Sequence, residues 1–182
     1  MTQDISTNLK QIKQTIGEDM NVLQIQQATK EDIKEIARIE SICFPKEEAA
    51  SERFIKERVE TFPESFFVGK IDNRIIGFIN GAVTNDKTIS DEMFEHVHLH
   101  NPEGNYQMIF GLDVLPEYER KGYGKQLMIY MITVSKKRGK KGLVLTCKEH
   151  LISFYEQFGY QVVGKSASTH GGATWYDMIL EC

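Results

Sequence analysis

Gly122, Tyr123 and Gly124 follow a strongly apolar stretch, and basic residues flank them on both sides. The apolar stretch, residues 106–115, predicts a strand, and Pro116 ends it because proline cannot donate a hydrogen bond to a neighbouring strand. A helix is expected to begin at Gly122. The first N–H groups of a helix have no intrahelical partner, and the helix dipole favours negative charge. The turn therefore predicts an anion site, and its glycines allow a phosphate to approach the backbone closely.

Two common phosphate-binding patterns do not fit this turn. The P-loop pattern requires glycine at position 119 and serine or threonine at position 126, where this sequence has Glu119 and Gln126. The dinucleotide pattern requires a small residue at position 127, which is Leu127. Both patterns are excluded, and a glycine-bearing helix start with solvated basic side chains is the alternative to a ligand site.

The composition is that of one globular domain. The chain has 182 residues, of which 41% are hydrophobic and 26% are charged. Its net charge of −4 argues against a general nucleic-acid binder. Three widely spaced cysteines indicate a reducing compartment, so we expect a cytoplasmic location. Because no apolar run is long enough to span a bilayer, we expect no membrane partner.

The periodicity of apolar residues predicts strands and helices in alternation. Residues 1–20 are expected to form a helical extension, and residues 21–182 the domain itself. Strands are expected over residues 22–28, 66–71, 74–84, 106–115, 143–147, 160–164 and 174–180. Two helices are expected between the first two strands, capped by Thr29 and Ser51, with others over residues 122–139 and around Ser153. Residues 85–105 are expected to form a polar connection.

The run Arg120-Lys121-Gly122-Tyr123-Gly124 resembles the pyrophosphate loop of the GNAT acetyltransferases, although Glu119 departs from the first position of the family pattern. Three stretches are similar to the arylalkylamine N-acetyltransferase group, the serotonin N-acetyltransferase type: FPESFFVGKIDNRIIGFINGAV, LHNPEGNYQMIFGLDVLPEYERKGYGK and LVLTCKEHLISFYEQFGYQVVG. The resemblance implies an α/β (α+β) fold in a single GNAT-type domain. Such a domain has a mixed central β-sheet of six to seven strands flanked by helices, with splayed central strands forming an acetyl-CoA cleft.

The resemblance also implies which residues bind acetyl-CoA. The backbone of the central strand pairs with the pantetheine arm in such enzymes, as an added strand would. At the matching positions this sequence has Leu112, Asp113 and Val114, and the side chains of Leu112 and Val114 are expected in the core. The pyrophosphate is expected at Arg120, Lys121, Gly122, Tyr123, Gly124 and Lys125.

Tyr155 is the expected catalytic residue. The run Phe154-Tyr155-Glu156-Gln157-Phe158-Gly159 matches a family motif whose tyrosine lies beside the sulfur of acetyl-CoA and acts as general acid. A thiolate leaves more readily when it receives a proton or a hydrogen bond. The alternative is a core tyrosine, because Leu151, Tyr155 and Phe158 share one helical face.

The proton acceptor of the resembled group is missing. Arylalkylamine enzymes relay the amine proton through two histidines, and at the matching positions this sequence has Met108 and Phe110, which we expect in the wall of the substrate pocket. Either a water chain leads to another group, or the amine arrives neutral. His100 lies upstream and could reach the pocket. The pattern His96-x-His98-x-His100 could ligate zinc, but suitable further ligands are lacking, so we expect no metal.

Two functions of different class remain open. The first is acetyl-CoA-dependent acetylation of a primary amine, expected to be a small and possibly arylalkyl amine, or else a protein or another amine acceptor. The second is a non-catalytic acyl-CoA-binding module. Tyr155 favours the enzyme, and the missing histidines favour the binding module. A monomer or a homodimer is expected.

Overall fold

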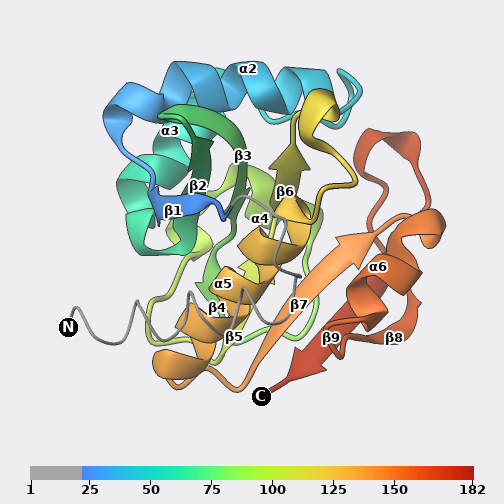
Figure 1. The fold of residues 1–182 in the computed structure, drawn as a ribbon. Coiled ribbons are helices and arrows are strands. Elements are labelled where there is room, and N and C mark those ends of the chain that lie inside the picture. Colours follow the sequence, from blue (N-terminus) through green and yellow to red (C-terminus); the bar gives the residue numbers. More distant parts are fainter. Residues whose placement is uncertain (1–21) are drawn as a thin grey trace.

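Two β-sheets form the centre of the molecule, and helices cover them (Figure 1). The computed structural model describes residues 22–182. The helix expected over residues 1–20 and its boundary with the domain lie outside the described residues. The strands are β1 Gln24–Gln27, β2 Phe66–Ile71, β3 Arg74–Asn80, β4 Val83–Thr84, β5 Tyr106–Ile109, β6 Gly111–Val114, β7 Gly142–Cys147, β8 Gln161–Lys165 and β9 Tyr176–Glu181.

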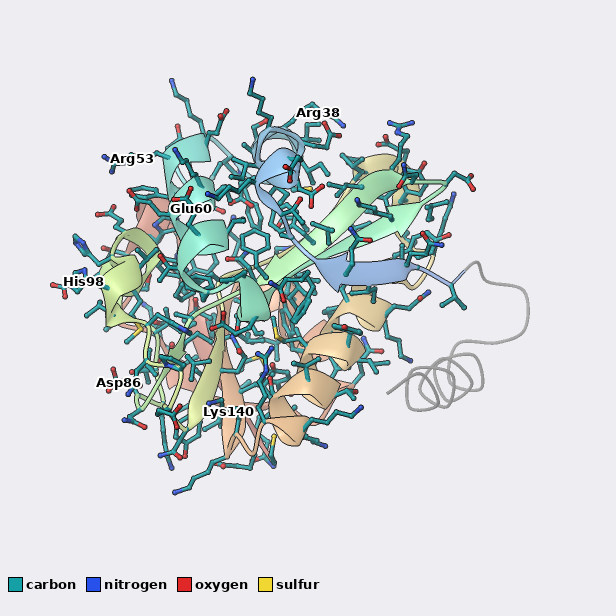
Figure 2. The ribbon with its side chains drawn as sticks, turned by 90° about the vertical axis from the view of Figure 1, so that its left-hand side faces the viewer. Arg38, Arg53, Glu60, Asp86, His98 and Lys140 are labelled. Atoms are coloured by element: carbon teal, nitrogen blue, oxygen red, sulfur yellow. The ribbon has the colours of Figure 1, made fainter. Side chains whose placement is uncertain are left out.

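Five α-helices connect or cover these strands in residues 22–182. They are α2 Ile33–Cys43, α3 Glu52–Thr61, α4 Asp91–Glu95, α5 Tyr123–Lys137 and α6 Ile152–Glu156. Short 3-10 helices lie at Lys30–Asp32, Pro63–Ser65, Val97–Leu99, Pro116–Tyr118, Glu149–Leu151 and His170–Gly172. Charged side chains such as Arg38 and Arg53 project outward into solvent (Figure 2).

The first sheet has the order β1-β2-β3-β6 and is antiparallel throughout. The second has the order β4-β5-β7-β9-β8, in which β5 and β7 are parallel and the other pairs are antiparallel. This mixed arrangement with flanking helices confirms the expected fold class. Residues 22–182 contain nine strands where six to seven were expected, because two of the expected strands are each divided into two.

The first division lies at Gly81, in the stretch 74–84 that was expected to be one strand. A Cβ atom at Gly81 would lie 1.8 Å from the carbonyl oxygen of Met108, so only glycine permits this close approach of two backbones. The buried Gln107 side chain donates to the carbonyls of Gly81, Ala82 and Met108 at 2.8–3.2 Å. It replaces the ladder bonds that are lost where the chain leaves β3 and enters β4.

The second division lies at Phe110, in the stretch 106–115 that was also expected to be one strand. The N–H of Phe110 donates to the carbonyl of Asn80 at 2.8 Å, and from Gly111 onward the chain pairs with β3 alone. Before Phe110, β5 pairs with β4 and β7. The resembled family predicts such a bulge in the central strand, and here it places β5 and β6 in different sheets.

Local signals in the sequence account for the turns and caps. Thr29 and Asp32 form the expected capping box, and the N–H of Thr29 donates to the Asp32 carboxylate at 2.9 Å. Ser51 caps α3 by accepting from the N–H of Phe54 at 3.3 Å. Asp72 and Asn73 adopt left-handed φ angles of 48° and 63°, as expected for a tight turn.

The connection 85–105 is more structured than its polar sequence predicts. It contains α4, whose Met93 is buried with Ile89 and Met108 in a small apolar cluster. A helix of five residues is too short to display apolar periodicity, so the sequence gives no clear signal for it.

The core lies on both faces of the first sheet. Leu127 and Met131 of α5 are fully buried on one face. Ile36 and Ile39 of α2, together with Ile55 of α3, are fully buried on the other. Burying such a side chain contributes about 1.5–3 kcal/mol. This packing holds β6, which borders the candidate site, between α5 and α2.

Candidate active site

The turn before α5 has the backbone geometry of an anion site. Arg120 and Gly122 both adopt left-handed conformations, with φ angles of 57° and 79°, and Gly122 is the N-cap of α5. Alternation of this kind turns successive N–H groups toward one point, and the first turn of α5 adds its own free N–H groups. The side chains of Arg120 and Lys121 are exposed. The structure therefore brings the predicted pyrophosphate residues 120–125 together.

In this turn, Tyr123 can offer a ligand only its backbone, and Gly124 has room for a larger residue. The Tyr123 side chain is buried in the core against Tyr118, so only its N–H is available to a ligand. A Cβ atom at Gly124 would lie 3.7 Å from Val114 and 3.8 Å from Phe154, which is ordinary contact. The close approach of a ligand to this turn therefore depends on Gly122, whose left-handed backbone disfavours other residues.

Strands β6 and β7 lie next to one another but do not pair. In the described chain β6 bonds to β3 only, and β7 bonds to β5 and β9. Figure 1 shows the two strands diverging beside α5. Gly111 and Leu112 of β6 and Thr146 and Cys147 of β7 line one cavity between them. The free edge of β6 is therefore open to an added extended chain, as the resemblance implies for pantetheine.

Among the β6 residues expected to bind the cofactor, Leu112 and Val114 direct their side chains into the core cluster around α5. The Val114 carbonyl accepts a hydrogen bond from the Cys43 thiol at 3.3 Å, so it is engaged on the α2 side. Asp113 is 1% exposed and its side chain lies with Glu40 and Arg58. A role of Asp113 and Val114 in binding the cofactor through their backbone stays a prediction.

The pKa of Asp113 is raised well above its usual range, first by burial and then by the adjacent charge of Glu40, while Arg58 opposes the shift. Burial lowers the pKa of the Arg58 guanidinium to about 10. Arg58 donates to Asn80 Oδ1 at 3.3 Å and to the carbonyl of Phe94 at 2.9 Å. The cluster forms a polar floor under Gly111, where the central strand is divided.

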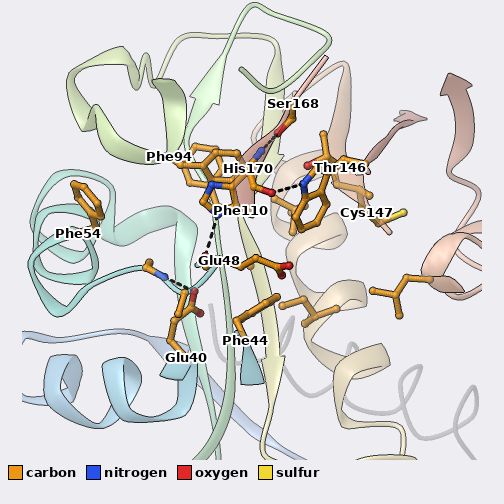
Figure 3. A pocket seen from close by; sticks show the side chains of 18 of the residues that line it. Glu40, Phe44, Glu48, Phe54, Phe94, Phe110, Thr146, Cys147, Ser168 and His170 are labelled. Carbon is orange, nitrogen blue, oxygen red and sulfur yellow. Dashed lines mark hydrogen bonds between the residues drawn. The ribbon is translucent and has the colours of Figure 1, made fainter. Parts of the chain in front are cut away.

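The cavity has a volume of about 250 Å³. It lies between the divided central strand, the loop after α2, the end of α4 and the loop after β8 (Figure 3). Its aromatic wall consists of Phe44, Phe54, Phe94, Phe110, Tyr155 and Trp175. Its ionisable residues include Glu40, Glu47, Glu48, Arg58, Glu95 and His170. A site with many rings and more acids than bases suits a cation with an apolar body.

Tyr155 lines this cavity from α6 and is 9% exposed. Its ring lies 5.1 Å from that of Phe154 and 6.0 Å from that of Tyr160. Burial raises its pKa far above the usual range, and the nearby Cys147 and Asp113 raise it further. The phenol therefore keeps its proton at neutral pH and can donate it or a hydrogen bond into the cavity.

Of the three residues expected in the substrate pocket, Phe110 lines this cavity, and Met108 and His100 do not. Phe110 lines the cavity, with the Arg58 guanidinium 5.0 Å from its ring centroid. Met108 is fully buried in the cluster with Met93 and does not line the cavity. The two positions differ because the division at Phe110 turns the strand between them.

His100 also lies outside the cavity lining. Its Nδ1 accepts from the N–H of Val83 at 3.0 Å, and its Nε2 lies 2.9 Å from Glu64 Oε1. Burial lowers its pKa, while Glu64 opposes the shift. This histidine ties β4 to the start of β2 and has a structural role. Residues 22–182 contain no group of three or more His, Cys, Asp or Glu side chains placed to hold a metal ion.

The sequence analysis missed Glu48, His170 and Trp175. The Glu48 side chain is 6% exposed; its Oε1 lies 2.7 Å from the Lys148 ammonium, and its Oε2 is buried without a hydrogen-bond partner. His170 Nε2 lies 3.0 Å from the carbonyl oxygen of Glu48. These residues come from loops far apart in the sequence, and none stands in a recognisable motif, so only the folded chain brings them together.

Residues 31–160 match the Acetyltransferase (GNAT) family, which is more than half of the chain. The chain belongs to the GNAT acetyltransferase family. The family identified from the sequence is thus confirmed. No helix of residues 22–182 is both long and apolar enough to cross a membrane.

Two curated relatives of the GNAT chain are named N-acetyltransferases. Serotonin N-acetyltransferase of Mesocricetus auratus is 30% identical over 112 residues, which are 61% of this chain and 52% of the relative. "Uncharacterized N-acetyltransferase YkwB" of Bacillus subtilis is 30% identical over 142 residues, 71% of this chain and 63% of the relative. The chain therefore spans between half and two thirds of the length of these curated relatives.

Solved structures with the GNAT fold superimpose over most of the chain. The loading GNATL domain of CurA from Lyngbya majuscula has a TM-score of 0.77 at 14% identity, covering 88% of this chain and 98% of that one. The PaiA N-acetyltransferase from Thermoplasma acidophilum, in complex with coenzyme A, has a TM-score of 0.64 at 20% identity, covering 89% and 100%. At these identities the likeness shows the fold alone.

Proposed function

We propose that this protein transfers the acetyl group of acetyl-CoA to the primary amine of a small molecule with an apolar arylalkyl body. The observation that carries the proposal is the cavity between the free edge of β6 and the end of β7, whose Thr146 and Cys147 pair with β9 only. It joins aromatic rings with several acidic residues, Glu48 among them. The relation to serotonin N-acetyltransferase supports the same class of acceptor.

The two substrates take different sides of the site. The N–H groups and basic side chains of residues 120–125 bind the pyrophosphate, and the β6 edge holds the pantetheine arm beside Leu112. The acetyl thioester then enters the cavity next to Tyr155. The acceptor amine lies against the aromatic wall, with its cationic group toward the acidic residues of the lining, Glu48 among them. Attraction between the ammonium group and these carboxylates favours binding.

Transfer then needs two proton movements. The neutral amine nitrogen attacks the carbonyl carbon of the thioester, and the carbon–sulfur bond breaks as the carbonyl re-forms. The leaving thiolate receives a proton or a hydrogen bond from the Tyr155 phenol, and the nitrogen loses a proton to a base. Tyr155 is suited to the first movement because it lines the cavity and its phenol is protonated at neutral pH.

A thiol-release assay over a panel of amines tests the proposal. The purified protein is incubated with acetyl-CoA and phenethylamine, an aliphatic amine, a lysine-containing peptide or an alcohol, and products are weighed by mass spectrometry. We expect release of free CoA together with acetylation of phenethylamine, and no reaction of the alcohol. A protein that binds acetyl-CoA but acetylates none of these amines would instead be a non-catalytic acyl-CoA-binding module. Faster acetylation of the peptide would indicate a protein acceptor.

A further inference from the structure

We propose that His170 is the general base of this site and accepts the amine proton on Nδ1. This inference rests on the proposed function, in which the base that accepts the amine proton is not assigned. The positions where the resembled group has histidines are Met108 and Phe110, which cannot accept a proton. His170 lies on another element, in the loop between β8 and β9, and lines the same cavity as Tyr155.

The hydrogen bond of the ring selects its tautomer. Nε2 lies 3.0 Å from the carbonyl oxygen of Glu48, and a carbonyl oxygen only accepts, so Nε2 carries the hydrogen. In the neutral ring the lone pair is then on Nδ1. A histidine whose one nitrogen donates to a backbone carbonyl is held in orientation and has its other nitrogen ready as a base.

The ring is fixed on several sides. It stacks on Phe94 with ring centroids 5.2 Å apart and an interplanar angle of 19°, and Trp175 lies 6.2 Å away (Figure 3). The Trp175 indole donates to the His170 carbonyl at 2.8 Å, and the N–H of His170 donates to Ser168 Oγ at 3.2 Å. A base held this firmly loses little entropy when the substrate arrives.

The loop that carries His170 is tied down at both of its sides. Asp91 of α4 accepts from Ser168 Oγ and from the N–H of Thr169. Gly171 has a φ angle of 62°, and a Cβ atom there would lie 2.5 Å from Glu48 Cγ. Glycine at this position therefore lets the loop pack directly on the segment that carries Glu48, which brings the carboxylate and the imidazole to one wall of the cavity.

Charged residues surround His170. Acidic residues lie near it on two elements: Glu47 and Glu48 on the loop after α2, and Asp91 and Glu95 on α4. Glu40 of α2 also lines the cavity. The cations are Arg58 of α3 and Lys148, which is paired with Glu48. Acids therefore outnumber bases around the ring.

The proton balance of the reaction is then complete. The ammonium group of the bound amine first gives one proton to Nδ1 of His170, which releases it to solvent. The neutral nitrogen then forms its bond to the acetyl carbon, and its second proton moves to the same Nδ1. The carbon–sulfur bond breaks, and the sulfur takes the phenolic proton of Tyr155. The imidazolium and the phenolate exchange their protons with solvent before the next turnover.

The substitution His170→Gln tests the assignment, because a glutamine amide can still donate to the Glu48 carbonyl but cannot accept a proton. The rate kcat is measured with saturating acetyl-CoA and phenethylamine from about pH 6 to about pH 10. We expect a loss of about a hundredfold near neutral pH, within the usual range of general base catalysis. The loss should shrink toward high pH, because the amine then arrives neutral and the first of its two proton transfers is no longer needed.

The matched control is His98→Gln, at an exposed histidine whose side chain points away from the molecule (Figure 2). It should keep the wild-type rate and pH profile. An acetyl-CoA-induced rise in melting temperature shows that each variant is folded. If His170→Gln does not fold, His170→Ala is assayed with added imidazole, which should restore turnover.

The possible results separate the two proposals. A His170→Gln rate equal to that of the wild type, a loss that is the same at every pH, or no rescue of His170→Ala by imidazole overturns the role of His170 and leaves the acetyltransferase assignment intact. A wild-type protein that acetylates no amine overturns both.

Discussion

The cofactor side and the acceptor side of the site are built in different ways. On the cofactor side, β6, the turn at residues 120–122 and the first turn of α5 follow one another in the sequence. They present backbone N–H groups, and the identity of most side chains matters little. The acceptor side is formed by side chains from the loop after α2, from α4, from the divided central strand and from the loop after β8.

This difference explains why the sequence indicates the cofactor side more clearly than the acceptor side. A contiguous site made of backbone needs glycine at fixed places, so it leaves a motif. A site made of side chains from distant segments depends on tertiary packing, and it can change its residues while the fold persists. The proposed cofactor site is therefore readable from the sequence, whereas the proposed acceptor pocket and base require the structure.

Gly122→Glu should have the largest effect, because it breaks the cofactor side alone. The variant places bulk and negative charge where the pyrophosphate binds, in a left-handed conformation that disfavours glutamate. We expect the acetyl-CoA-induced rise in melting temperature, worth about 2.7 kcal/mol at a hundredfold excess over Kd, to disappear.

The control is Gly139→Glu at the other end of α5, where φ is 71° and a Cβ atom would meet nothing within 4 Å. It should lower the melting temperature but keep the rise with acetyl-CoA. A rise that survives in Gly122→Glu would remove the turn from the binding site.

Tyr155→Phe tests the boundary between the two sides. The phenol meets the sulfur only as charge develops there, so its loss affects the transition state more than the ground state. We expect kcat to fall by about ten- to a thousandfold, with acetyl-CoA binding unchanged. Tyr160→Phe, at a buried neighbour whose hydroxyl meets Met128, should keep its kcat. Full activity of Tyr155→Phe at saturating substrates would make Tyr155 a packing residue.

Glu48→Gln should affect the acceptor side only. The amide keeps the size of the side chain but removes the charge that pairs with an ammonium group. A hydrogen bond to a charged group contributes about 1.5–3 kcal/mol, so KM for the amine should rise about tenfold or more. The KM for acetyl-CoA is the internal control. Equal changes in both constants would show that the two sides are not separate.

Asp113→Asn should have the smallest effect, on the pH dependence of stability. The raised pKa means that the folded state keeps a proton that the unfolded state releases above about pH 4. Unfolding therefore becomes easier as pH rises above the unfolded-state pKa, and the wild-type melting temperature should fall as the pH is raised from about pH 4.

Asparagine removes this proton and can still donate to Glu40. The melting temperature should therefore depend less on pH in the variant. Its fall over the pH range should be smaller by about 2–4 °C for each kcal/mol that the Asp113 proton contributes to stability. Parallel slopes in the two proteins would show that Asp113 is ionised in the folded state.

The sequence predicted features whose cause is local. The caps at Thr29 and Ser51, the turn at Asp72 and the start of α5 each depend on residues within a few positions, and the structure confirms them. The division of the strand at Phe110 could be inferred only from the resemblance, because it depends on which strand pairs with β6. Met108 and His100 lie outside the cavity lining, which the sequence does not indicate because their contacts are with distant segments.

His170 is the clearest example of a candidate site residue that the sequence alone does not indicate. Its role depends on the Glu48 carbonyl, 122 positions earlier in the chain, and on Phe94, 76 positions earlier. No spacing in the sequence reports such contacts. The buried charge of Glu48 is equally invisible, because glutamate in a loop is ordinarily exposed.

In the proposed mechanism, the cavity and the cofactor cleft form one continuous site. The most direct test is the affinity of a bisubstrate analogue, in which an acetyl group joins the sulfur of CoA to the nitrogen of phenethylamine, measured by titration calorimetry. The account predicts that the wild type binds this analogue at least about tenfold more tightly than CoA. Ala49→Trp, which fills the cavity, should remove the gain and leave CoA binding unchanged. Equal affinity of the wild type for the analogue and for CoA would contradict the claim.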